Sequence, residues 1–163
     1  MKKKSQAPSD NFEVNFNKVL RFLSFRQRSE KEIKDYLLKK NVSSYVSSKI
    51  IEKLKEFKFL NDEEFARAWI SSRKTSKPKP WRIIKLELRR KGISEELIES
   101  FEPEKEEENE LDLDAARKIV EKKIGKYKGL SKNEIYQKLG RHLASKGFDW
   151  DTVKRSIDEV TSK

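Results

Sequence analysis

Apolar residues recur every three or four positions along most of the chain, and this spacing predicts a series of amphipathic helices. In chain order, the apolar stripes occupy residues 16–23, 33–37, 46–57, 65–72, 81–88, 116–124, 135–143 and 150–160. Alternation with a period of two occurs only in residues 12–16, and an isolated strand has no partner for its backbone hydrogen bonds. We therefore predict an all-α fold.

The spacing within the stripes also predicts which large side chains are buried. Phe57 extends the stripe of residues 46–57, and Ala68 and Trp69 lie on the stripe of residues 65–72. Trp81 and Trp150 are the first residues of their stripes, and further apolar residues follow each of them at helical spacing. Stacking on a nucleic-acid base is the alternative role for the tryptophans, but the helical spacing favours a place in a hydrophobic core.

Residues that accept hydrogen bonds from free backbone N–H groups precede several stripes and predict where helices begin. Ser29 and Ser131 are each followed three positions later by glutamate, which is the pattern of a capping box. Either Asn61 or Asp62 can cap the helix that follows it. Pro80 ends one segment and has the fixed φ suited to the first turn of the next helix.

One helix-end motif occurs three times at similar spacing. Each copy has two apolar residues four positions apart, a lysine in the last turn, a residue that can adopt φ > 0, and an apolar residue that returns to the core. The copies are IKDYLLKKNV (33–42), IKLELRRKGI (84–93) and LGRHLASKGF (139–148). They predict three tandem three-helix, helix-turn-helix-like repeats, and the alternative is a single irregular helical bundle.

These boundaries predict how the chain is divided. We expect a disordered basic N-terminus at residues 1–11 and three-helix repeats at residues 12–60, 61–101 and 111–163. Residues 102–110 are expected to form an acidic linker, which becomes helical toward its C-terminal end.

The distribution of charge along the chain bears on function. The formal charge is +11, yet residues 102–114 alone carry −7, so the rest of the chain carries +18. This balance predicts a polyanionic partner, with nucleic acid as the first candidate. The alternative is a solubilising surface rich in lysine and glutamate. With 34% hydrophobic and 41% charged residues, we expect small cores and much solvated surface.

The residue inventory argues against an enzyme. Cysteine is absent, which excludes disulfides and Cys-ligated zinc, and His142 is the only histidine. There is no glycine-rich phosphate loop, and the acidic run lacks elements that would position it around Mg²⁺. We expect no catalytic residues, no cofactor and no metal site. No apolar run approaches a membrane span, so we expect a cytoplasmic protein that does not bind membranes. We also expect a monomer.

The strongest candidate binding surface lies in the middle of the chain. Between residues 73 and 91, Glu87 is the only acid, whereas positive charge is dense. Phosphates or an acidic protein face would be bound by such a cluster without sequence readout. The candidate DNA-binding or partner-binding residues are Arg73, Lys74, Lys77, Lys79, Arg82, Lys85, Arg89, Arg90 and Lys91.

The chain resembles the RecX family, bacterial regulators of the recombinase RecA, over residues 17–160. The resemblance rests on RQRSEKEI (26–33), LNDEEFA (60–66), LRRKGI (88–93) and LASKGF (143–148), of which LNDEEFA is the most specific. Where family members often carry a glycine before the second helix of the middle repeat, this chain has KPKP (77–80).

This resemblance implies three tandem three-helix repeats in an elongated, curved arrangement. It also implies binding in the groove of the RecA filament on single-stranded DNA and inhibition of filament growth, ATP hydrolysis and strand exchange. The biological context that it implies is DNA recombination, DNA repair and the SOS response.

Two readings of function compete. The first is a regulator of RecA filaments with sequence-independent affinity for single-stranded and double-stranded DNA. The second is a helix-turn-helix-like transcription regulator that reads a major groove. The helix that follows Pro80 opens with mostly apolar residues, whereas a recognition helix presents polar residues there for base edges. Uniform affinity across DNA sequences favours the first reading, and a preferred operator favours the second.

Overall fold

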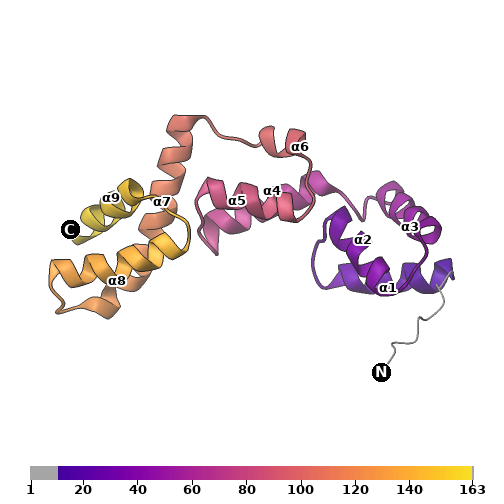
Figure 1. Ribbon diagram of the computed structural model, residues 1–163, viewed down its shortest axis with the longest axis horizontal. Coiled ribbons are helices and arrows are strands. Elements are labelled where there is room, and N and C mark those ends of the chain that lie inside the picture. Colours follow the sequence, from indigo (N-terminus) through magenta and orange to yellow (C-terminus); the bar gives the residue numbers. More distant parts are fainter. Residues whose placement is uncertain (1–10, 163) are drawn as a thin grey trace, which may run out of the picture. The chain divides into compact units, whose positions relative to one another are not determined.

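The structure is a computed structural model that describes residues 11–162, and within this range it contains helices and no strand (Figure 1). The helices are α1 (Phe12–Ser24), α2 (Glu30–Lys39), α3 (Ser44–Glu56), α4 (Asp62–Thr75), α5 (Trp81–Arg90), α6 (Glu95–Glu99), α7 (Lys105–Ile124), the 3₁₀ turn η1 (Gly125–Tyr127), α8 (Lys132–Ser145) and α9 (Trp150–Thr161). The predicted all-α fold is confirmed.

The candidate strand at residues 12–16 is the start of helix α1. Asn11 caps this helix, because its side-chain oxygen accepts a hydrogen bond from the Val14 N–H at 2.9 Å. Phe12 and Phe16, one turn apart, stack with ring centroids 5.5 Å apart. The predicted disordered N-terminus lies outside the described residues except for Asn11.

Local capping chemistry sets several other helix starts. Both predicted capping boxes are present, at Ser29 and at Ser131. Asn61 caps α4 by accepting from the N–H groups of Glu63 and Glu64 at 2.9 and 3.2 Å. Asp62, the alternative cap, instead accepts a 2.8 Å hydrogen bond from the Glu30 N–H at the start of α2. Asn61 therefore caps α4, and Asp62 contacts α2.

The acidic segment is more ordered than its composition suggested. Helix α7 begins at Lys105 and therefore includes most of residues 102–110, which were expected to form a linker. Acidic residues in its first turn are stabilised by the free N–H groups of the helix start, which explains why a charge-rich run is helical there.

The chain divides into two compact units, which are described separately. The first comprises Met1–Arg67 and Arg89–Leu97, and the second comprises Ala68–Leu88 and Ile98–Lys163. The core of the first unit is formed by Val19, Ile33, Leu37, Val42, Val46, Ile50, Ile51, Leu54 and Leu60. In the second unit α7 packs against α8 and α9, around Ala115, Ala116, Ile119, Val120, Leu139, Leu143, Phe148, Val153 and Ile157.

The repeated helix-end motif folds as predicted. All its apolar positions are buried in all three copies, including Val42, Ile93 and Phe148. The residues before these, Asn41, Gly92 and Gly147, adopt positive φ of 54°, 80° and 97°. The left-handed residue therefore ends each helix and returns the chain to the core.

Several predicted core positions are wrong. Phe57 ends helix α3 as its C-cap, so its side chain leaves the helical stripe and is 48% exposed. Trp150 is the first residue of α9 and is 63% exposed. Ala68 is exposed, because the buried face of α4 runs through Phe65, Ala66 and Ile70.

The other two tryptophans are less exposed than Trp150. Trp81 is buried as predicted. Trp69 is half-buried.

Candidate nucleic-acid interface

The nine candidate cations between residues 73 and 91 are divided between the two units. Arg73, Lys74, Lys77, Lys79, Arg82 and Lys85 belong to the second unit, whereas Arg89, Arg90 and Lys91 belong to the first. The cations also differ in whether they are paired with other residues or exposed.

In the second unit, three of the cations are held by other parts of the fold. The Arg73 guanidinium lies 2.5 Å from the Glu87 carboxylate and over the Trp69 ring, 4.4 Å from its centroid. Lys85 forms an ion pair of 2.5 Å with Glu102. Arg82 donates a 2.8 Å hydrogen bond to the Gly147 carbonyl oxygen. Lys74 and Lys77 are exposed, and Lys79 is half-buried.

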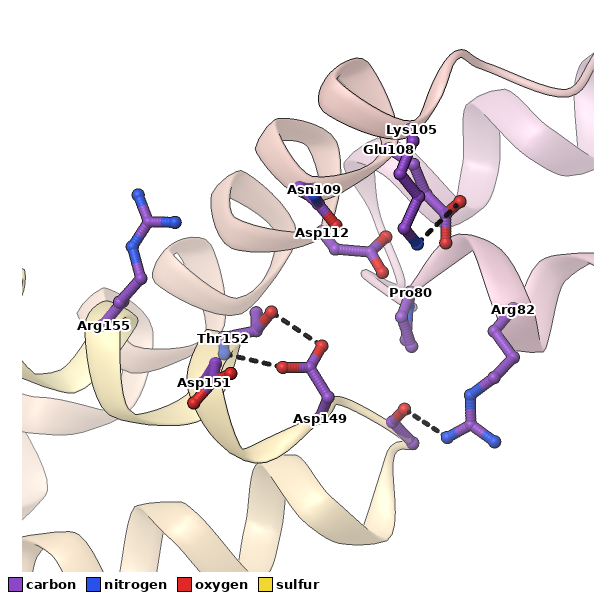
Figure 2. Close-up of a pocket in the computed structure, with 11 residues that line it drawn as sticks. Pro80, Arg82, Lys105, Glu108, Asn109, Asp112, Asp149, Asp151, Thr152 and Arg155 are labelled. Atoms are coloured by element: carbon purple, nitrogen blue, oxygen red, sulfur yellow. Dashed lines mark hydrogen bonds and ion pairs between the residues drawn. The ribbon is translucent and has the colours of Figure 1, made fainter.

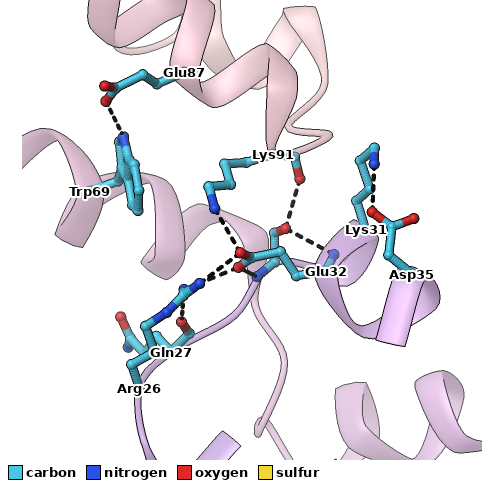
Figure 3. A network of polar contacts seen from close by, with 9 residues as sticks. Arg26, Gln27, Lys31, Glu32, Asp35, Trp69, Glu87 and Lys91 are labelled. Carbon is cyan, nitrogen blue, oxygen red and sulfur yellow. Dashed lines mark hydrogen bonds and ion pairs between the residues drawn. The ribbon is translucent and has the colours of Figure 1, made fainter. Parts of the chain in front are cut away.

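In the first unit, Lys91 and Arg89 serve structural contacts. Lys91 pairs with Glu32 at 2.6 Å, and Arg26 pairs with the same carboxylate at 2.7 Å (Figure 3). The buried Ser29 hydroxyl donates to the Lys91 carbonyl oxygen at 2.7 Å. Arg89 pairs with Glu95, and Arg90 is exposed.

The Glu32 carboxylate is strongly perturbed by this network. Its partial burial alone would raise its pKa, but the hydrogen bonds from Arg26 and Lys91 and their charges outweigh burial and lower the pKa to about 2. Lys91 and Arg26 therefore contribute to the stability of the first unit, and one carboxylate offsets part of their charge.

A second set of cations converges on a groove of about 600 Å³ in the second unit. The end of α4 and the α4–α5 loop form one wall with residues 73 and 75–79, and α7 and α8 form the other. We call it the basic groove. Its charged or titratable lining consists of Arg73, Lys77, Lys79, Lys118, Lys122, Lys123, His142 and Lys146, and no described acid lines it.

The electrostatics of the basic groove show that its cations face one another. Burial, followed by the charges of Lys79 and Lys123, lowers the pKa of Lys146. Burial, followed by the charges of Lys123 and Lys146, lowers the pKa of His142. The His142 Nε2 atom is buried and has no hydrogen-bond partner among the described residues. A bound anion would relieve this repulsion.

Only Arg73, Lys77 and Lys79 belong both to the predicted set and to the basic groove. Sequence reasoning missed Lys118, Lys122 and Lys123 on α7 and treated Lys146 only as the lysine in the last turn of the repeated motif. The available signal was the four-residue spacing of Lys118 and Lys122, which places both on one face of α7. Their proximity to the α4–α5 loop has no local signal, because some forty residues separate them from it.

A separate pocket of about 450 Å³ in the second unit has mixed charge (Figure 2). Glu108, Asp112 and Asp149 line it together with Arg82 and Lys105. We call it the polar pocket. Its charges largely offset one another, and within residues 11–162 no cluster of potential metal ligands is found. The polar pocket is therefore a weaker candidate than the basic groove for an anionic ligand.

Asp112 in the polar pocket joins α7 to the start of α5. Its buried carboxylate accepts a 2.8 Å hydrogen bond from the Trp81 N–H, which caps α5. Burial, opposed by this hydrogen bond and assisted by the charges of Glu108 and Asp149, raises the pKa of Asp112 to about 6.

Comparison with known proteins identifies the family. The family models for the first, second and third three-helix domains of RecX match residues 16–54, 61–100 and 110–157. The chain belongs to the RecX family. The resemblance drawn from the sequence motifs is thus confirmed.

Curated RecX relatives match over most of this chain. The regulatory protein RecX of Bacillus subtilis is 38% identical over an alignment of 157 positions, which covers 93% of this chain and 56% of the relative. That of Bacillus pumilus is 36% identical, with 93% and 57% covered. A Streptococcus pneumoniae RecX is 33% identical, with the same coverage. The chain thus spans little more than half the length of the curated relatives it matches.

Solved RecX structures share the fold. The crystal structure of RecX from Lactobacillus salivarius aligns with a TM-score of 0.69 at 25% identity, covering 93% of this chain and 97% of that one. A second RecX crystal structure aligns with a TM-score of 0.68 at 23% identity, covering 90% and 73%. None of the helices in residues 11–162 has the length and apolar composition that a bilayer span requires.

Proposed function

We propose that this RecX chain regulates homologous recombination by binding RecA–DNA filaments and inhibiting filament growth, ATP hydrolysis and strand exchange. The RecA filament is the partner that membership of the RecX family implies. Sequence-independent affinity for DNA, single-stranded and double-stranded, is the second part of the proposal.

The basic groove is the observation that supports DNA affinity. Seven described lysines and arginines line it. Arg73 and Lys118 are paired with Glu87 and Asp114, but these two carboxylates are not part of the groove lining. Contacts from such side chains to phosphates release counterions and give affinity that depends on salt and not on base sequence. Lys74 and Arg90, which are exposed, add long-range attraction. Arg82, Lys85, Arg89 and Lys91 would first have to leave their partners.

The structure of α5 disfavours the transcription-regulator alternative. A recognition helix presents polar side chains near its start to base edges. Here Trp81 and Ile84, in the first turn of α5, are buried. The helix therefore contributes its opening residues to the core.

The test is RecA's single-stranded-DNA-dependent ATP hydrolysis with this protein at substoichiometric amounts. The groove variant Lys122→Ala/Lys123→Ala/Lys146→Ala is compared with a control of equal charge loss, Lys128→Ala/Lys138→Ala/Lys154→Ala. The control lysines are exposed and lie outside the basic groove. We expect wild type and control to inhibit at low ratio and the groove variant to inhibit far less.

Salt dependence of direct DNA binding separates phosphate contact from misfolding. Each lost phosphate contact reduces the slope of log K against log salt by about 0.7 on single strands, so the groove variant should lose roughly 2. Equal slopes for the two triple variants would contradict the role of the basic groove. A strong preference for one duplex sequence would instead support a transcription regulator. Inhibition that requires enough protein to coat the DNA would indicate competition for phosphate, without specific regulation of the filament.

A further inference from the structure

The first unit has a groove of its own, of about 370 Å³, formed by α1 and α2. Its described lining combines three cations with three aromatic rings and includes no acid and no aliphatic side chain. We call it the aromatic–basic groove, and it is lined by Lys18, Arg21, Phe22, Phe25, Tyr36 and Lys40. The basic groove belongs to the second unit and is a separate feature.

Two of the rings belong to a fixed column. The Phe22 and Tyr36 rings stack with centroids 4.3 Å apart and 12° between their planes. The Arg28 guanidinium lies over Phe22 at 3.8 Å, and the Lys40 ammonium lies 5.7 Å from the Tyr36 centroid. Because Arg28 and Tyr36 both lie over Phe22, they occupy its opposite faces. Phe22 therefore has no face left for a ligand.

Phe25 differs from the other two rings. It is the C-cap residue of α1 and is 74% exposed. No aromatic ring or cation of the described residues lies over the Phe25 ring. An exposed phenylalanine beside Lys18 and Arg21 contributes little to the core, yet presents a ring face next to positive charge.

We propose that the aromatic–basic groove binds single-stranded nucleic acid, with Phe25 stacking on a base while Lys18, Arg21 and Lys40 contact the phosphates. A single strand offers unstacked base faces and phosphates together, which is the combination that this lining complements. A duplex keeps its base faces stacked inside, and an apolar peptide would gain little from three cations. The inference extends the proposed DNA affinity, because it adds a preference for single strands that the basic groove lacks.

The test measures the binding of the full chain to two oligomers by fluorescence anisotropy. One is a short oligo(dT), and the other is an abasic oligomer with the same number of phosphates. Phe25→Ala is compared with Phe25→Trp, which keeps a stacking ring. The matched control is Tyr45→Ala, which removes a 67% exposed ring on α3 outside the groove. Each variant is also made in the Lys122→Ala/Lys123→Ala/Lys146→Ala background, so that the basic groove does not mask the effect.

We expect Phe25→Ala to weaken oligo(dT) binding about tenfold, the loss typical of one base stack, and to leave abasic binding unchanged. Phe25→Trp and Tyr45→Ala should bind oligo(dT) as wild type does. Unchanged oligo(dT) binding by Phe25→Ala, or an equal loss on the abasic oligomer, would overturn the stacking role.

The outcome also separates this inference from the proposed function. If Phe25→Ala bound DNA as tightly as wild type does, the stacking site would be overturned and the basic groove would still stand. If the wild type bound neither oligomer, the DNA part of the proposed function would fail as well. Loss of RecA inhibition by Phe25→Ala with unchanged DNA binding would assign Phe25 to a protein contact and overturn the inference.

Discussion

Asp112→Asn should stabilise the protein at neutral pH, because the Asp112 carboxylate is buried and burial disfavours its charged form. Its pKa is about 6 in the folded chain against an ordinary value of 3.8, so the folded state holds its proton more tightly than the unfolded state. The stabilisation from protonation is complete below pH 3.8 and is lost as the pH rises through 6. Asparagine keeps an oxygen for the Trp81 N–H and has no charge.

The size of the effect follows from the same pKa difference. At 1.36 kcal/mol for each pKa unit, the upper bound is about 3 kcal/mol at pH 7. The carboxylate adjoins the open polar pocket, where solvent screens its charge, so we expect ~1–2 kcal/mol. Asp112→Ala has the opposite effect, because it leaves the Trp81 N–H buried without an acceptor, which costs about 1–3 kcal/mol.

Urea unfolding followed by circular dichroism between pH 4 and pH 8 measures these differences. Asp112→Asn should exceed wild type in free energy of unfolding at pH 7.5 and converge with it near pH 4. Asp151→Asn removes an exposed carboxylate from the same pocket and should leave the pH dependence unchanged. A difference between Asp112→Asn and wild type that stays constant with pH, or that favours wild type at pH 7.5, would refute the reasoning.

Two further predictions concern the stability of the units. Glu32→Gln should cost about 1–2 kcal/mol at pH 7, after allowance for solvent screening, because the lowered pKa of Glu32 stabilises the fold above its ordinary value of 4.5. That contribution is lost as the pH falls through about 2, so urea unfolding curves that still differed there would argue against it. Gly147→Ala should lower the free energy of unfolding by about 2–3 kcal/mol, because φ is 97° and the added Cβ would overlap Ile83. Gly129→Ala, at φ 87° with open space around it, should lose only about 1 kcal/mol in thermal unfolding, and equal losses would exclude the overlap.

The parts of the fold that were predictable depend on local chemistry. The capping boxes at Ser29 and Ser131 and the left-handed residues after the repeated motif follow from neighbours within a few positions. The misassigned Ala68 shows the limit of periodicity. Over a short stripe, a shift of two positions gives an equally plausible face, and only the packing of α4 selects Ala66.

The candidate site was predictable only in part, because charge density does not reveal pairing. Lys91 and Lys85 meet Glu32 and Glu102, which lie 59 and 17 positions away in the sequence. Conversely, Lys122 and Lys123 gain importance only when α7 brings them to the α4–α5 loop. Both effects depend on tertiary contacts that no local pattern encodes.

The contact between Arg73 and Trp69 gives the basic groove an optical signal. Arg73 lines the groove and lies over the Trp69 indole, whose Nε1–H donates to Glu87 at 2.9 Å (Figure 3). An anion that draws the guanidinium away changes the electric field at the indole and hence its emission. With Trp81 and Trp150 replaced by phenylalanine, Trp69 becomes the sole indole, and occupancy of the groove can be followed by fluorescence titration without an attached dye.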